Sequence, residues 1–198
     1  MRFNARVRAK RPNIRVTDAR TPLVGAIATI ATISAFGFLP PVPAFECVAL
    51  GAFAAAVTVF DVSRFRIPDA LNAAGVLAGV AAATAHVPGS SAASAAMFAV
   101  ARASCAALTA LVVRVGYRKA RGREGLGLGD VKLAAVAGAW LDPFSALMAV
   151  EVAAVSAIFV ALACARFRPA RLSPSMKIPF GAYFAPAIWL TWVAARWA

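Results

Sequence analysis

Long hydrophobic runs alternate with short polar connections along most of the chain. A helix needs about 20 apolar residues to cross the roughly 30 Å hydrocarbon core of a bilayer. Six runs approach that length, and each is predicted to be a membrane-spanning helix: Leu23–Leu39, Ala44–Phe60, Ala70–Val87, Ala92–Val113, Pro143–Ala165 and Pro179–Ala195. A seventh run, Val131–Leu141, is shorter, and the pattern leaves open whether it crosses alone or continues into the run that begins at Pro143. The predicted fold is therefore an all-α polytopic membrane helical bundle with six to seven transmembrane segments.

The composition supports a membrane protein. Hydrophobic residues make up 62% of the chain and charged residues 15%, whereas a soluble domain has about 45–50% apolar and about 25% charged residues. A disordered chain lacks the apolar content that is abundant here. The net charge of +13 could indicate a nucleic-acid partner, but the basic residues lie between apolar runs and not on one face of a soluble module. We expect a lipid bilayer as a partner and no nucleic acid.

The basic residues are concentrated in alternate connections, which predicts the orientation. They precede the first run, follow the second and fourth, and precede the last, whereas Pro40–Pro43 and Pro88–Ser91 contain no Lys or Arg. By the positive-inside rule, the N-terminus and the basic loops face the cytoplasm. Seven segments are favoured over six, because the loop at Arg166 must return to that side. We expect residues 1–21 to be a basic cytoplasmic leader and residues 22–198 to form one transmembrane domain of a multi-pass membrane protein.

Two aspartates stand at the ends of apolar runs. Asp61 directly follows Phe60, and Asp130 directly precedes Val131. A charged side chain within a span costs about 2.5–3.5 kcal/mol even on the lenient insertion scale, so such residues are usually functional or paired. The predicted topology places both acids at the cytoplasmic boundary, where a bundle could set them side by side. Two adjacent carboxylates share one proton, and such a pair can activate water against a peptide carbonyl, as in an aspartic protease.

The residues that precede and follow Asp130 are candidates for shaping the site. Gly127 and Gly129 would allow unusual backbone dihedrals and the close approach of backbone or substrate. Lys132 could favour the charged form of Asp130 or extend to the lipid headgroups. A phosphate-binding loop is the rival interpretation of the glycines, but no strand precedes them and the Gly-Lys-Ser/Thr ending is missing.

The residues that follow Asp61 form a second candidate group. Arg66 is expected to hold the loop at the cytoplasmic face and could favour the ionised form of Asp61 or Asp69. Pro68 is expected in the first turn of the third span, where its missing N–H donor is harmless. Asp69 would complement the helix dipole at the start of that span, and contact with substrate is the alternative.

No cofactor or metal site is expected. Cys47, Cys105 and Cys164 lie in separate apolar runs without a C-x-x-C pair, which excludes a zinc ribbon by spacing and makes a disulfide framework improbable. His86 is expected at a membrane interface and not as a metal ligand. An ion pair between Arg102 and Glu151 would reduce the insertion cost of both, but the sequence does not show whether they meet. Three tryptophans with Arg196 are expected to form an interfacial belt: Trp189, Trp192 and Trp197.

The residues around the two acids resemble the type IV prepilin peptidase family, membrane aspartic proteases of the Gly-x-Gly-Asp class. The first matching motif is Asp61…Arg66-Ile67-Pro68. The second is Gly127-Leu128-Gly129-Asp130-Val131-Lys132-Leu133, and a weaker third is Lys177-Ile178-Pro179-Phe180-Gly181. The resemblance covers the chain from about Asp61 to Gly181.

The resemblance implies a specific activity. The family cleaves the short basic leader from prepilins and pseudopilins on the cytoplasmic side of the membrane, with Asp61 and Asp130 as the corresponding catalytic pair and Gly127 and Gly129 shaping the second site. The position occupied by Asp69 is usually Asn in such proteins. The chain has no room for the cysteine-containing domain that is associated with methylation in longer members, so it resembles the short, peptidase-only form.

Two alternative functions remain open at the level of sequence. An intramembrane protease of the presenilin or signal-peptide-peptidase kind also pairs an aspartate with a Gly-x-Gly-Asp motif, but it usually adds a Pro-Ala-Leu signature, which this chain lacks. A proton-coupled transporter could use the same acids as a proton relay. Transporters are commonly built from internal repeats, and none is visible here. The sequence does not predict the oligomeric state.

Overall fold

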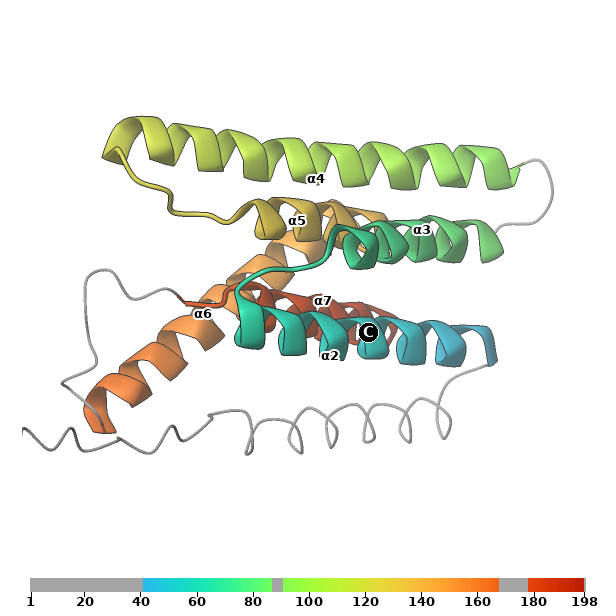
Figure 1. Ribbon diagram of the computed structural model, residues 1–198. Coiled ribbons are helices and arrows are strands. Elements are labelled where there is room, and N and C mark those ends of the chain that lie inside the picture. The colour runs from blue at the N-terminus through green and yellow to red at the C-terminus, as the bar shows by residue number, and fades with distance from the viewer. Residues whose placement is uncertain (1–40, 87–90, 168–177, 198) are drawn as a thin grey trace, which may run out of the picture.

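The computed structural model describes residues 41–86, 91–167 and 178–197, and this part of the chain consists of helices joined by short connections (Figure 1). Its helices are α2 (Pro41–Arg64), α3 (Asp69–Ala85), α4 (Ser91–Arg121), α5 (Leu128–Trp140), α6 (Pro143–Phe167) and α7 (Gly181–Trp197). The predicted all-α membrane bundle is confirmed. The first predicted span, Leu23–Leu39, and the basic leader before it lie outside the described residues.

Three of the described helices are long and apolar enough to cross a membrane: Pro43–Arg64, Ser91–Arg121 and Pro143–Ala163. The helix α5 has 13 residues, which at 1.5 Å per residue is about 20 Å and shorter than the roughly 30 Å of hydrocarbon. Residues 141–142 separate α5 from α6. The short seventh run is therefore a helix of its own and does not continue into the following one.

The helices pack as two groups of three. In one group α4 lies along α5 and α3, and α3 also packs on α5. In the other, α2 and α6 both pack on α7, and α6 crosses the remaining helices obliquely (Figure 1). The groups meet mainly where α5 contacts α7 and where α2 contacts α3.

Apolar side chains of both groups share one core. Among the most deeply buried are Leu50, Leu133, Ile188 and Trp192. The Trp192 ring meets Trp140 edge to face at a centroid distance of 6.2 Å, and the Arg196 guanidinium lies 3.8 Å from the centroid of the Trp192 ring. The prediction of an interfacial belt is therefore wrong for Trp192, because its side chain points into the bundle.

Gly138 allows α5 to approach α4 closely. A Cβ atom at this position would stand 2.5 Å from the carbonyl oxygen of Arg102. The Arg102 side chain also crosses to α5, where Nε donates a hydrogen bond to the Gly138 carbonyl at 3.2 Å. Carbonyls in the last turn of a helix lack intrahelical partners and favour a cation. Arg102 therefore caps α5 and does not pair with Glu151, which is exposed on α6.

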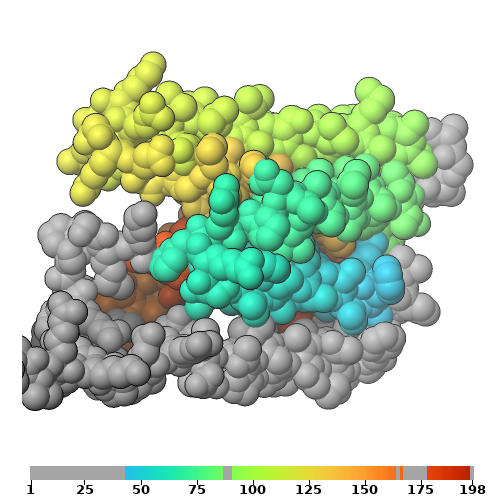
Figure 2. Space-filling view, viewed as in Figure 1, coloured from blue at the N-terminus to red at the C-terminus, as the bar shows by residue number. Residues whose placement is uncertain are grey.

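The outer surfaces of α4 and α6 are rich in large apolar side chains. Met97, Phe98 and Val112 on α4 and Phe159 and Leu162 on α6 are all well exposed. Figure 2 shows α4 as one long edge of the molecule, open along its outer side. A large exposed apolar surface of this kind is typical of a protein that meets lipid.

A buried carboxylate joins three elements at the end of α2 remote from Asp61. Glu46 is 5% exposed. His86 Nε2, just beyond the end of α3, lies 3.0 Å from the Glu46 carboxylate, and Nη2 of Arg196, near the end of α7, lies 3.7 Å from it. Glu46 therefore connects α2, α3 and α7 at that end of the bundle.

Candidate active site

The two aspartates lie on different helices but line the same pocket. Asp61 is in the last turns of α2 and is 7% exposed, and Asp130 is in the first turn of α5. The pocket has a volume of about 310 Å³. Its lining residues are Asp61, Phe65, Arg66, Ile67, Asp69, Gly127, Leu128, Gly129, Asp130 and Lys132. Of the eight residues predicted to form the site, seven line this pocket and Pro68 does not.

The start of α7 holds the Asp61 carboxylate. The backbone N–H of Ala182 donates a hydrogen bond of 3.0 Å to Asp61 Oδ2. Gly181 makes this approach possible, because a Cβ atom there would stand 3.0 Å from Asp61 Oδ2 and 2.8 Å from Ile67 Cδ1. The partial positive charge at a helix N-terminus favours a neighbouring anion, so α7 contributes backbone groups to the site.

Asp130 is held by the backbone that precedes its own helix. The N–H of Gly127, the N-cap of α5, donates a hydrogen bond of 3.2 Å to Asp130 Oδ2, which is the side-chain half of a capping box. Asp130 lies outside the three helices long enough to span a membrane. Burial and, to a smaller extent, the charge of nearby Asp61 raise the pKa of Asp130 to about 6.

Ile67 packs between the first residues of α5 and α7, close to both acids. It is buried, and its Cδ1 atom would lie 3.4 Å from a Cβ placed on Gly129 and 2.8 Å from one placed on Gly181. The two glycines therefore provide the space that this side chain fills. Their contribution is close packing and not an unusual dihedral, since among the described glycines a positive φ occurs at Gly122.

The connection from α2 to α3 turns sharply beside Asp61. Phe65 has a φ of 51°, in the left-handed region, and its N–H donates a hydrogen bond of 2.9 Å to the Asp61 carbonyl, closing the last turn of α2. Pro68 is the N-cap of α3 and not part of its first turn as predicted. Its carbonyl accepts a hydrogen bond of 3.2 Å from the N–H of Asn72. Pro68 therefore supplies the first acceptor of the helical hydrogen bonds although it lies outside the helix.

Lys132 and Asp69 form an ion pair across one side of the pocket. Nζ of Lys132 lies 2.5 Å from Asp69 Oδ1. The hydrogen bond and the charge of Lys132 lower the pKa of Asp69, and Arg66 lowers it to a smaller extent. Lys132 is therefore bonded to Asp69, which is neither of the two roles predicted for it. Both side chains are largely exposed, so the pair contributes little to stability but joins α3 to α5.

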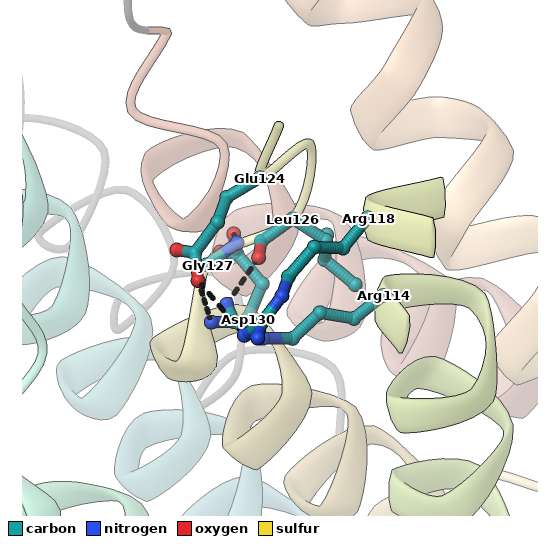
Figure 3. A network of polar contacts seen from close by, with 6 residues as sticks. All are labelled: Arg114, Arg118, Glu124, Leu126, Gly127 and Asp130. Atoms are coloured by element: carbon teal, nitrogen blue, oxygen red, sulfur yellow. Dashed lines mark hydrogen bonds and ion pairs between the residues drawn. The ribbon is translucent and has the colours of Figure 1, made fainter. Parts of the chain in front are cut away.

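Several contributors to the site were not among the predicted residues, and Ile67, Gly181 and Arg114 are the most informative of them. Ile67 and Gly181 belong to the motifs that carry the family resemblance, and this membership was the available signal. Arg114 carried no such signal, because it is one of several basic residues near the end of α4. Arg114 is 8% exposed and belongs to the polar network that reaches Gly127 and Asp130 (Figure 3).

The arrangement is suited to proton transfer at a buried point. Two carboxylic groups share one pocket, and their proximity makes the ionisation of one oppose the ionisation of the other. A water molecule or a peptide group would fit a cavity of this volume. In the described ranges, no three His, Cys, Asp or Glu side chains are grouped so that they could hold a metal ion.

A comparison with models of protein families finds a match. The model of the type IV leader peptidase family matches residues 48–162, a range that contains Asp61 and Asp130 and more than half of the chain. No curated protein matches the chain significantly, and no solved structure does.

Proposed function

Because the chain belongs to the type IV leader peptidase family, we propose that it is an aspartic endopeptidase that removes the leader peptide of prepilins or pseudopilins. The observation that carries the proposal is that Asp61 and Asp130, which are distant in sequence, line one pocket. In this proposal the protein lies in the bacterial inner membrane with its N-terminus in the cytoplasm, and the pocket opens at the cytoplasmic boundary.

The reaction requires one ionised and one protonated carboxyl group. The ionised group takes a proton from water as the water oxygen attacks the scissile carbonyl carbon. The protonated group donates its proton toward the carbonyl oxygen, which becomes the hydroxyl of a tetrahedral intermediate. When the C–N bond breaks, the leaving nitrogen takes a proton from the pair, one hydroxyl of the intermediate returns its proton to the pair as the carbonyl reforms, and the new carboxyl end and the free amine leave. The dyad returns to its singly protonated form.

The position of the pocket suggests how substrate is presented. The apolar segment of a prepilin would lie against the exposed apolar faces of the bundle while its basic leader stays in the cytoplasm. The bond between them would then reach the level of the two acids without unfolding of either partner. Holding the scissile bond at this depth keeps it next to the two acids and the attacking water, and such positioning lowers the reaction barrier substantially.

The proposal is tested by the N-terminus of a pilin. A prepilin with a basic leader is co-expressed with the full chain in a host without its own leader peptidase, and the pilin is analysed by intact-protein mass spectrometry. We expect cleavage at the junction of the basic leader and the apolar segment. An intact leader contradicts the proposal. Cleavage inside the apolar segment would instead indicate a presenilin-like intramembrane protease, and solute flux without cleavage would indicate a transporter.

The rate of cleavage is expected to fall as the pH rises through the pKa of Asp130. That pKa is raised to about 6 by burial and by the charge of Asp61, so the shared proton is lost above it. In the alkaline limb, kcat/KM should fall about tenfold per pH unit. The measurement is kcat/KM of the purified protein in detergent, with a prepilin, from about pH 5 to about pH 9. A rate independent of pH over this range would argue against a shared proton.

A further inference from the structure

The segment that leads into α5 is held by an arginine from a different helix. Arg114 lies in the C-terminal half of α4, just beyond the end predicted for the fourth span, and it is the buried charged residue of that helix. Its Nη1 donates a hydrogen bond to the carbonyl oxygen of Leu126, and its Nη2 lies 2.8 Å from Glu124 Oε1. Figure 3 shows these contacts converging on the turn just before Asp130.

The carbonyl that Arg114 binds belongs to the peptide group that also contacts Asp130. In the Leu126–Gly127 peptide, the C=O accepts from Arg114 and the N–H donates to Asp130 Oδ2 at 3.2 Å. A peptide group is planar and rigid, so fixing the carbonyl also fixes the direction of the N–H. Hydrogen bonds in a chain polarise one another, so a cation on the carbonyl strengthens the N–H as a donor.

We propose that Arg114 is a positioning residue for Asp130, which it orients through the Leu126–Gly127 peptide group. The inference rests on the proposed peptidase function. Arg114 does not line the pocket, so it acts on the reaction through Asp130 and not on the substrate. Its positive charge also favours the ionised form of Asp130 and so lowers the pKa of that group, against burial and the charge of Asp61.

The neighbouring residues provide matched controls within the same network. Glu124 is the second partner of Arg114 and is 58% exposed. Arg118 lies 3.8 Å from the same Glu124 oxygen and is 66% exposed. Replacing Glu124 by Gln removes an ion pair from the turn but leaves the contacts of the Leu126–Gly127 peptide. Replacing Arg118 by Gln removes an equal positive charge that does not reach this peptide.

The experiment compares Arg114→Gln, Arg114→Lys, Glu124→Gln and Arg118→Gln in the full chain, with kcat, KM and the pH profile measured on a purified prepilin. For Arg114→Gln we expect kcat to fall about 10–100-fold, as for a misplaced catalytic group, with little change in KM. The alkaline limb of the profile should move to higher pH, because a cation that favours ionised Asp130 is gone. The two control variants should keep the wild-type profile.

Arg114→Lys separates charge from geometry. Lysine keeps the positive charge but lacks the planar fork, so the profile should stay in place while kcat falls at least about fivefold, since the orientation of the peptide is lost. If Arg114→Gln does not accumulate in the membrane, the proposal can be tested with Arg114→Lys alone. A wild-type kcat and profile in either folded variant overturns the proposal. So does an equal loss in Glu124→Gln, because Arg114 would then only anchor the turn. If Asp61 and Asp130 prove dispensable, it is the peptidase function that fails.

Discussion

Replacing either Asp61 or Asp130 by asparagine is expected to reduce the cleavage of a co-expressed prepilin by about 10²–10⁴-fold, the usual contribution of a general acid or base. Asparagine cannot carry or release the shared proton. Its amide oxygen can still accept the N–H of Ala182 at position 61, or that of Gly127 at position 130, so the fold should be retained. The double variant should be no slower than the single ones, because the two groups act as a unit.

The matched control is Asp142→Asn. Asp142 lies just beyond the end of α5 opposite to Asp130, where its carboxylate accepts the N–H groups of Phe144 and Ser145 at the start of α6. Asparagine is as good an N-cap as aspartate, so this variant should cleave at the wild-type rate. The readout is the fraction of mature pilin over time, with the amount of each variant in the membrane measured in parallel. Wild-type cleavage by both Asp61→Asn and Asp130→Asn would exclude the dyad.

The substitution Gly138→Ala is expected to cause a large loss of stability. The added methyl group would stand 2.5 Å from the Arg102 carbonyl oxygen and 3.0 Å from the Ala103 Cα atom. Both are backbone atoms of α4, so no change of rotamer can relieve the contact and the two helices must separate. Overpacking of this kind costs typically about 1–3 kcal/mol. Thermal unfolding in detergent, followed by circular dichroism, should show a clearly lower midpoint.

Gly116→Ala is the control for the loss of a helical glycine. Gly116 also lies in α4, and a Cβ atom there meets no other atom within 4 Å. Its replacement by alanine should be neutral or stabilise the helix by roughly 0.5–1 kcal/mol. If Gly138→Ala unfolds at the same temperature as Gly116→Ala, the close approach of α4 and α5 is not a source of stability.

The sequence predicted the helices well because apolar runs in a membrane protein are long and uninterrupted, but it predicted their ends less well. The fourth span was expected to end at Val113, whereas α4 continues to Arg121. Hydropathy detects only the apolar part, while Arg, Lys and Ala are good helix formers and extend the helix beyond it. Similarly, α5 begins at Leu128, before the apolar run, because Gly127 and Asp130 cap it.

The sequence predicted those residues of the candidate site that lie at or near a charged residue at the end of an apolar run. Asp61 and Asp130 were visible because each interrupts the end of an apolar run. The partners of the charged side chains were not visible, since the pairing of Lys132 with Asp69 joins residues that are distant in sequence. The burial of Arg114 depends on how α4 packs against the turn before α5, and nothing in its own neighbourhood distinguishes it from Arg118.

The division of the helices into two groups has a consequence for the dyad. Asp61 belongs to α2, which packs on α7. Asp130 belongs to α5, which packs on α3 and α4. The separation of the carboxylates therefore depends on the interface between the two groups of helices, where Ile67 packs between Gly129 and Gly181. A small sliding motion at that interface would change the distance between the two acids. The hydrogen bonds from Ala182 to Asp61 and from Gly127 to Asp130 would be kept.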